Sequence, residues 1–422
     1  MAAPIRPTIE GRATASAPEP QATLRVHGGS GADAQSGGRQ SAHLVAPVAG
    51  TRWRGAYIHV PFCAHKCHYC DFYSLVDRED RQPAFTARFE RDAASFGERL
   101  AAPLATVFVG GGTPTLLAPP LLGRCLAAIA SLPREPGCEW TVEANPETVT
   151  AEVAGVLVAA GVNRVSLGAQ SFDPRHLATL ERHHDPASVG RAVGLLRGAG
   201  IGNLNLDLIF GIPGQTVAEA IGDVERALSL GPDHLSCYGL TYEPATALHA
   251  RRERGLVTPI DEEIEAEMYE GITARLAAAG FAPYEISNWS RPGRECRHNL
   301  VYWRNEPWWA IGPSGSGFVA GHRFKIVPRL GDWLAAPPGA TPIVDHEPPD
   351  RGRFLAESLL LGLRLVEGIP EALVAEAIAE RAGREGVFAR ALDRGLLVRE
   401  HGRLRFTAAG RLVADSVLSE LV

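Results

Sequence analysis

Short apolar runs alternate with longer helical patterns between residues 56 and 238. Strands are predicted at residues 56–60, 105–109, 139–143, 164–167, 203–209 and 234–238, and the stretches between them carry helical patterns. Short, almost continuously apolar strands separated by helices are typical of a parallel sheet with crossover connections. Six such units predict an α/β fold, an incomplete (β/α)6 TIM-like barrel.

Three cysteines, Cys63, Cys67 and Cys70, follow the first predicted strand with C-x3-C-x2-C spacing. Thiolates this close together usually bind a soft metal or an iron–sulfur cluster. Because a four-iron cluster has four corners, three ligands leave one iron open to a small molecule. A zinc knuckle is the alternative, with His65 or His68 as the fourth ligand, although these histidines lie inside the cysteine spacing. Structural disulfides are disfavoured by the odd number of cysteines.

Polar and glycine-rich residues recur just after the predicted strands. They are Gly110–Thr113, Glu143, Gln170 and Asp207, with Arg182 further along the chain. In barrels of this kind, the carboxyl ends of the strands build the active site, so we expect these residues to face one mouth. Glycines let the backbone approach a ligand, carboxylates accept hydrogen bonds, and arginine binds carboxylates. Each residue alone is more often structural, so the prediction depends on the set.

Composition narrows the remaining options. The chain has 422 residues, 45% of them hydrophobic, and a net charge of −6, so no basic field predicts nucleic-acid binding. The other cysteines are isolated and are interpreted as buried fillers, which favours a reducing compartment and a cytoplasmic location. We find no apolar run of about 18–20 residues and no apolar signal core. Residues 1–50 are predicted to be a disordered low-complexity tail, with an organelle transit peptide as the alternative.

The chain after residue 245 reads as a second region. Helices are predicted at residues 261–279, 351–366 and 370–382, a strand at residues 281–287, and an aromatic- and glycine-rich stretch at residues 289–320. We therefore divide it into an α+β extension (246–345) and a small winged-helix-like module (346–422). Winged helices can bind DNA, but the charge balance favours a structural cap.

Four strings together identify a family resemblance: YIHVPFC from Tyr57, GGGTPT from Gly110, NLDLIFGIPGQ from Asn205 and CRHNLVYW from Cys296. The chain resembles the coproporphyrinogen-dehydrogenase-like branch of the radical S-adenosylmethionine (SAM) superfamily, and within it the HemW-type heme chaperones. The resemblance covers about residues 55–422, with residues 51–245 as the partial barrel. It implies that Cys63, Cys67 and Cys70 hold a [4Fe-4S] cluster and that SAM completes it. The SAM-binding positions it implies are Tyr57, Tyr69, Gly111, Gly112, Thr113, Glu143, Gln170, Arg182 and Asp207, although binding of a second SAM is left open.

Two features separate the branches of this family. The dehydrogenase carries a fourth cysteine two places after the third, where this chain has Phe72. The chaperone branch carries an HNxxYW motif, which here is His298–Trp303. An imidazole is a good axial ligand for heme iron, so His298 is the candidate heme ligand, with Cys296 as a weaker one. Nearby aromatic side chains could stack on a macrocycle; they are Tyr302, Trp303, Trp308 and Trp309. The alternative is that His298 forms hydrogen bonds in a packed aromatic corner.

The resemblance implies a heme chaperone that delivers heme to hemoproteins. The alternatives are an oxygen-independent coproporphyrinogen III dehydrogenase, which uses a SAM-derived radical, and a related porphyrin-modifying radical enzyme. No nucleic-acid partner and no integral membrane segment are expected. Peripheral membrane association, the identity of the heme recipient, and a monomeric or homodimeric state are left open.

Overall fold

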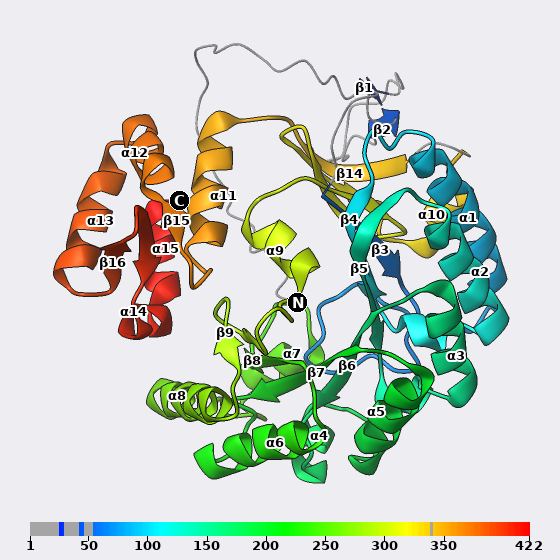
Figure 1. Cartoon of the computed structure of the whole chain (residues 1–422), viewed down its shortest axis with the longest axis horizontal. Coiled ribbons are helices and arrows are strands. Elements are labelled where there is room, and N and C mark those ends of the chain that lie inside the picture. The colour runs from blue at the N-terminus through cyan, green and yellow to red at the C-terminus, as the bar shows by residue number, and fades with distance from the viewer. Residues whose placement is uncertain (1–24, 29–41, 46–53, 338–340) are drawn as a thin grey trace.

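The computed structural model describes residues 25–28, 42–45, 54–337 and 341–422. Its centre is a run of six parallel strands: β3 (Gly55–Val60), β4 (Leu104–Gly111), β5 (Arg134–Ala144), β6 (Arg164–Gln170), β7 (Asn203–Phe210) and β8 (His234–Gly239). The connecting helices are α1 (Gln82–Gly97), α2 (Pro119–Ala130), α3 (Ala151–Ala160), α4 (Pro174–Thr179), α5 (Ala187–Ala199) and α6 (Val217–Ser229). These helices lie along the outside of a curved sheet (Figure 1). The predicted incomplete barrel is confirmed, because the strands at the two edges of the described sheet, β1 and β9, are not paired with each other.

Local sequence signals explain where the helices begin and end. The Thr150 side chain accepts a hydrogen bond from the Val153 N–H and begins α3, and Gly161 ends α3 with a φ of +94°. A capping box between Thr216 and Glu219 begins α6. Such caps satisfy backbone groups that a helix end leaves unpaired. They fix the points at which the chain returns to the sheet.

The sheet continues beyond the six central strands at both edges. Beside β3 it adds β11 (Trp308–Ile311), β12 (Ser316–Val319), β13 (His322–Ile326), β14 (Thr341–Glu347), β2 (Ala42–Val45) and β1 (Arg25–Gly28). Beside β8 it adds β10 (Asn288–Ser290) and β9 (Ala282–Pro283). The single strand predicted at residues 281–287 is therefore wrong. The chain reverses there, and the Tyr284 N–H bonds to the Asn288 carbonyl.

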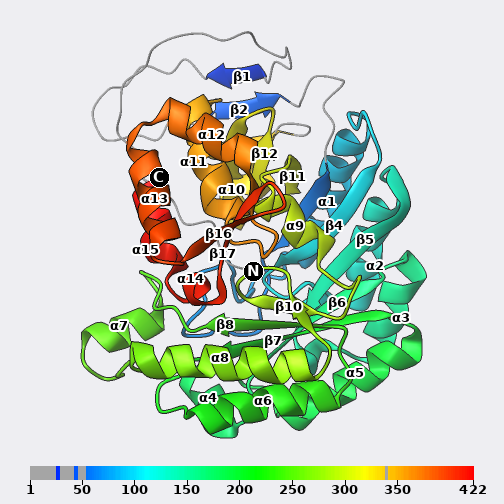
Figure 2. The ribbon, with the colours of Figure 1, turned by 60° about the vertical axis from the view of Figure 1, so that its left-hand side comes forward.

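The helices of the extension are α7 (Ala247–Glu253), α8 (Glu262–Ala278), α9 (Arg297–Trp303) and α10 (Leu330–Ala335). Helix α9 lies within the curve of the sheet, whereas α8 lies outside it next to α6 (Figures 1 and 2). β11 pairs in parallel with β3 over four residues. The extension therefore adds strands to the barrel sheet instead of forming a sheet of its own.

The C-terminal residues form a separate apolar core. The elements are α11 (Arg351–Gly362), β15 (Ile369–Pro370), α12 (Glu371–Glu380), α13 (Gly383–Asp393), β16 (Leu397–Glu400), β17 (Arg403–Phe406), α14 (Ala408–Leu412) and α15 (Ala414–Leu421). Phe388, Phe406 and Leu421 are among its buried side chains. The domain boundaries themselves stay a prediction. Of the predicted tail, only β1 and β2 lie among the described residues.

Among the described residues, no helix combines the length and apolar character needed to cross a bilayer.

Candidate functional site

The three cysteines lie in the loop that leaves the carboxyl end of β3. This loop is held to the following segment by two backbone hydrogen bonds, from the Cys63 N–H to the Leu75 carbonyl (3.0 Å) and from the Leu75 N–H to the Pro61 carbonyl (2.8 Å). Cys63, Cys67 and Cys70 are half-buried free thiols. The chain thus presents three soft ligands from one short loop, which suits an iron–sulfur cluster.

A chain of polar contacts connects two of these cysteines through the barrel mouth. The Thr113 hydroxyl lies 3.6 Å from the Cys63 Sγ, and the Asn145 Nδ2 donates to the Thr113 Oγ1 (3.0 Å). The Arg182 Nη2 donates to the Asn145 Oδ1 (3.0 Å) and to the Gly168 carbonyl (2.8 Å). The Arg182 Nη1 lies 3.8 Å from the Cys67 Sγ. Residues from the ends of β3, β4 and β5 and from the segment after α4 therefore meet at the cysteines.

Burial governs the protonation of the thiols. Loss of hydration raises the pKa of Cys63, although hydrogen bonds from Thr113 and Ser74 oppose the shift. Loss of hydration also raises the pKa of Cys70 to about 11. Metal ligation requires thiolates, so binding iron at this loop releases protons.

The glycine turn after β4 is packed closely against the cysteine loop. Gly111 has a φ of +104°, and a Cβ at this position would lie 2.5 Å from the His59 ring. The Gly112 N–H donates to the Val60 carbonyl (2.8 Å), and the Thr113 N–H donates to the Phe62 carbonyl (2.7 Å). Since these N–H groups already have partners, carbonyl oxygens are the groups left at this turn, and they would bind the ammonium group of an amino acid.

Glu143 and Asp207 lie near one another inside the mouth. Glu143 accepts a hydrogen bond from the Gly111 N–H (3.1 Å). Loss of hydration, reinforced by the negative charge of Asp207, raises the pKa of Glu143 to about 7. Asp207 accepts hydrogen bonds from the Ser166 hydroxyl (2.9 Å) and the Asn205 amide (2.8 Å). The mouth thus holds one carboxyl group that titrates near neutral pH and one that is fixed by hydrogen bonds.

The other predicted SAM-binding residues surround this centre. Gln170 ends β6 with a φ of +63°. Tyr57 is buried in β3 and its hydroxyl lies 3.0 Å from the His59 Nδ1. Tyr69 packs against Leu180 and Ile209. Gln170 therefore lies at the carboxyl end of its strand, whereas Tyr57 lies in the middle of β3 and is only 7% exposed.

Across the described residues, His298 forms no hydrogen bond to the cysteine loop or the glycine turn. It lies in the first turn of α9, and its Nδ1 lies 2.8 Å from the Thr106 hydroxyl while its Nε2 lies 2.8 Å from the Tyr302 hydroxyl. Thr106 pairs with Glu139 in the sheet, four residues before Glu143 in β5. At about 3.3 Å per residue, the Thr106–Glu139 pair lies about 13 Å along the strands from Glu143. His298 is 0% exposed, so in this conformation neither ring nitrogen is available to heme iron. The geometry agrees with the packed-corner alternative.

The neighbouring candidates are also packed. Cys296 is buried and donates to the Glu139 carboxylate. Trp308 contacts the Tyr302 ring with centroids 4.7 Å apart, and Trp309 stacks on Phe96 with centroids 5.9 Å apart. The tryptophans of β11 are therefore core residues and offer no exposed stacking face.

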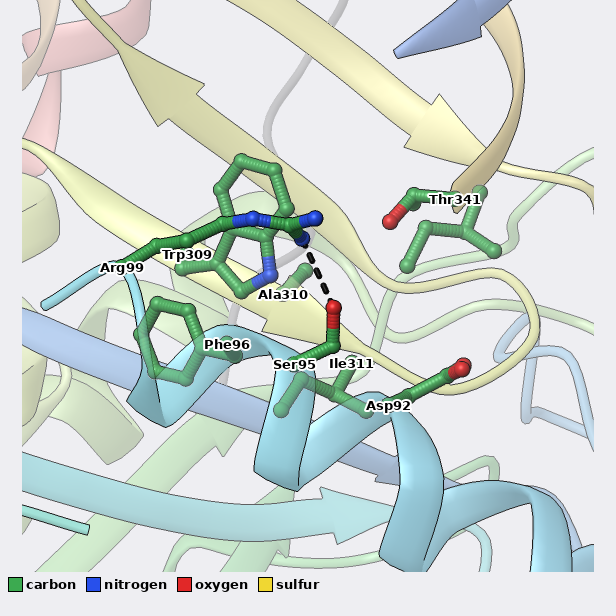
Figure 3. A pocket seen from close by; sticks show the side chains of 9 residues that line it. Asp92, Ser95, Phe96, Arg99, Trp309, Ala310, Ile311 and Thr341 are labelled. Carbon is green, nitrogen blue, oxygen red and sulfur yellow. Dashed lines mark hydrogen bonds between the residues drawn. The ribbon is translucent and has the colours of Figure 1, made fainter. Parts of the chain in front are cut away.

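A small cavity lies beside Trp309, between α1 and β11 (Figure 3). It is closed on one side by Arg99, whose Nη1 donates to the Ser95 hydroxyl (2.8 Å). Its volume is about 20 Å³. A cavity of this size holds a water molecule but no macrocycle.

Comparison with known proteins agrees with this geometry. Residues 57–227 match the family described as the Radical SAM superfamily. The coproporphyrinogen III oxidase HemN of Escherichia coli superposes with a TM-score of 0.75 at 20% identity, over 88% of this chain and 90% of that one, which shows a shared fold. The fold and the cysteine loop define a radical SAM protein.

The sequence relatives narrow the family. The chain is 41% identical to the heme chaperone HemW of Mycobacterium tuberculosis, over 90% of this chain and 97% of that protein. It is 34% identical to the heme chaperone HemW of Bacillus subtilis, over 86% of this chain and 98% of that protein. This chain belongs to the HemW family. The predicted family is confirmed.

Asn145, which joins Thr113 to Arg182, is not among the residues predicted from the sequence. Its position directly after β5, before Pro146, was the available signal. His59 is also absent from the predicted residues. Its Nε2 lies 2.8 Å from the Tyr73 carbonyl and connects β3 to the segment after the cysteines. His59 lies inside an apolar strand and not just after one, so its position gave no signal of a functional residue.

Proposed function

We propose that this protein is a cytoplasmic heme chaperone that carries a [4Fe-4S] cluster and SAM and delivers heme to hemoproteins. The observation that carries the proposal is the similarity, over nine-tenths of the chain, to proteins named heme chaperones. The presence of Phe72 in place of a fourth cysteine supports it.

The residues at the barrel mouth fit the two cofactors. Cys63, Cys67 and Cys70 would hold the cluster, and the donor set leaves one corner for SAM. The carbonyl oxygens of Gly111 and Gly112 and the carboxyl of Glu143 would accept from the SAM ammonium group. Asp207 and Gln170 would bind the ribose hydroxyls. The bound cluster and SAM would supply one-electron chemistry, and the protein would position and shield them.

Arg182 has a further role in this proposal, beside the SAM contact that the resemblance implies. Its guanidinium contacts Asn145, the Gly168 carbonyl and the Cys67 sulfur. These contacts favour a role in stabilising the thiolate side of the cluster, in addition to any contact with the SAM carboxylate.

The test uses protein reconstituted anaerobically with iron and sulfide. We expect stoichiometric iron and sulfide, a saturable Soret change on hemin titration, and transfer of heme to an apo-hemoprotein. Cys67→Ala should lose the cluster. No saturable Soret change in the wild type would refute the chaperone proposal. Conversion of coproporphyrinogen III to protoporphyrinogen, lost in Cys67→Ala, would establish the dehydrogenase alternative instead.

A further inference from the structure

Three side chains with metal-binding atoms meet on the outer side of the cysteine loop. His65 comes from the loop itself, and Glu181 and His183 come from the segment that follows α4. One nitrogen or oxygen atom from each side chain lies within 4.8 Å of the other two. The His65 and His183 rings are stacked, with centroids 4.2 Å apart and an interplanar angle of 28°. We call these three residues the outer site.

The outer site contains a buried polar atom with no partner. The Nε2 of His65 is buried and forms no hydrogen bond within the part of the chain that the structure describes. Buried polar atoms nearly always have a partner, either a protein group or an ordered water, so the unpaired Nε2 is open to a metal ion. A metal ion in the plane of the His65 ring would supply that partner.

The Glu181 carboxylate is oriented by its neighbours in the way that metal-binding carboxylates usually are. Its backbone has a φ of +57°, a region that non-glycine residues seldom occupy. Its Oε2 lies 2.7 Å from the His68 Nε2, and the His68 Nδ1 lies 3.4 Å from the Arg251 guanidinium. Outer hydrogen bonds of this type orient the carboxylates that bind metals.

We propose that His65, Glu181 and His183 form a second metal site, separate from the cysteines, for a divalent transition-metal ion of the zinc class. Two imidazoles and one carboxylate are a common ligand set for such ions. Around a tetrahedral zinc ion, ligand atoms lie roughly 3.3 Å apart and each imidazole points a ring nitrogen at the ion. The exposed His183 ring would therefore turn out of its stack on His65 to complete the site.

The fourth position of this ion would be open to solvent or to a small ligand. A cavity of about 250 Å³ adjoins Glu181 and His183 and is lined in part by Pro174, Leu177 and Pro186. The ion would also connect the cysteine loop to the segment that carries Arg182. It would therefore fix the loop without using a cysteine sulfur.

The test uses cluster-loaded protein, in which the thiolates are occupied, and zinc chloride as the probe. Zinc affinity is measured by calorimetry against His183→Ala and Glu181→Gln, with protein-bound iron and sulfide recorded at each point. His401→Asn, an exposed histidine in the β16–β17 turn, is the matched control. We expect one zinc ion per chain with no loss of iron, at least about tenfold weaker binding in both site variants, and unchanged binding in the control.

Three results would overturn the proposal. The first is no zinc binding to cluster-loaded wild type. The second is zinc binding that His183→Ala leaves unchanged, or that releases iron from the cysteines. The third comes from a parallel hemin titration: a spectral change that depends on His183, without zinc binding, would mean that the outer site takes heme iron instead.

Discussion

The Nδ1 of His298 lies 2.8 Å from the hydroxyl of Thr106, near the amino end of β4. The histidine of the HNxxYW motif thus joins α9 to β4, and the Glu139 carboxylate accepts from its N–H (3.0 Å). The motif therefore fastens the extension inside the sheet.

Replacing His298 by alanine should destabilise the protein by about 2–4 kcal/mol, because a buried ring is lost and two hydroxyl groups lose a partner. Urea unfolding measures this, with His401→Asn as a control that should change the free energy of unfolding by less than about 0.5 kcal/mol. We expect hemin binding to the folded variant to persist. Loss of the Soret change at full folding would instead support His298 as a heme ligand.

Acid should unfold the protein partly through the same histidine. Burial lowers the pKa of His298 to about 3, so between about pH 6.5 and pH 3 the unfolded chain binds a proton that the folded chain does not. Stability is therefore lost as the pH falls through this window. The decrease in the free energy of unfolding from pH 7 to pH 5 should be smaller in His298→Gln than in the wild type. An identical slope in both would contradict the assignment.

Glu143 should have the opposite pH dependence. Its folded-state pKa, about 7, is raised above the usual value near 4.5, so its contribution to stability is complete below pH 4.5 and is lost as the pH rises through 7. Glu143→Gln should stabilise the cofactor-free protein by roughly 1–3 kcal/mol at pH 8 and hardly at all at pH 5. Thermal unfolding at the two pH values measures the difference. An equal change at both would show that the carboxyl group is ionised throughout.

Gly111→Ala should disrupt the cysteine loop. The residue needs a φ of +104°, and a Cβ there would meet the His59 ring, which supports the segment after the cysteines. We expect a loss of about 2–4 kcal/mol and reduced iron content after reconstitution. Gly194, in α5, is the matched control, because a Cβ there meets nothing within 4 Å. Gly194→Ala should stabilise the helix by up to about 1 kcal/mol and leave iron content unchanged.

Arg182→Gln should lower the reduction potential of the reconstituted cluster. The guanidinium lies 3.8 Å from the Cys67 sulfur, and hydrogen bonds to cluster sulfurs favour the reduced form. We expect a shift on the order of 50 mV, close to a tenfold change in a one-electron equilibrium. A redox titration followed by electron paramagnetic resonance measures it, with the exposed Arg191→Gln as control. No shift would mean that Arg182 acts only through Asn145 and Gly168.

The barrel could be predicted because its signals are local. An apolar strand such as residues 203–209 is followed by a helix with its own cap, and the observed β7 differs by one residue. The cysteine spacing is equally local, since one loop supplies all three ligands. The family strings then assigned roles to residues that the pattern alone left open.

Contacts between distant segments could not be predicted. The sequence alone determined the alternating strands and helices, the three-thiol loop and the family. Only the tertiary structure decided that β11 extends the sheet beside β3, that Asn145 connects Thr113 to Arg182, and that both nitrogens of His298 form hydrogen bonds to buried hydroxyl groups. The reason is physical: apolar periodicity specifies which face of an element is buried, whereas the partner against which it is buried depends on packing of residues far apart in the chain.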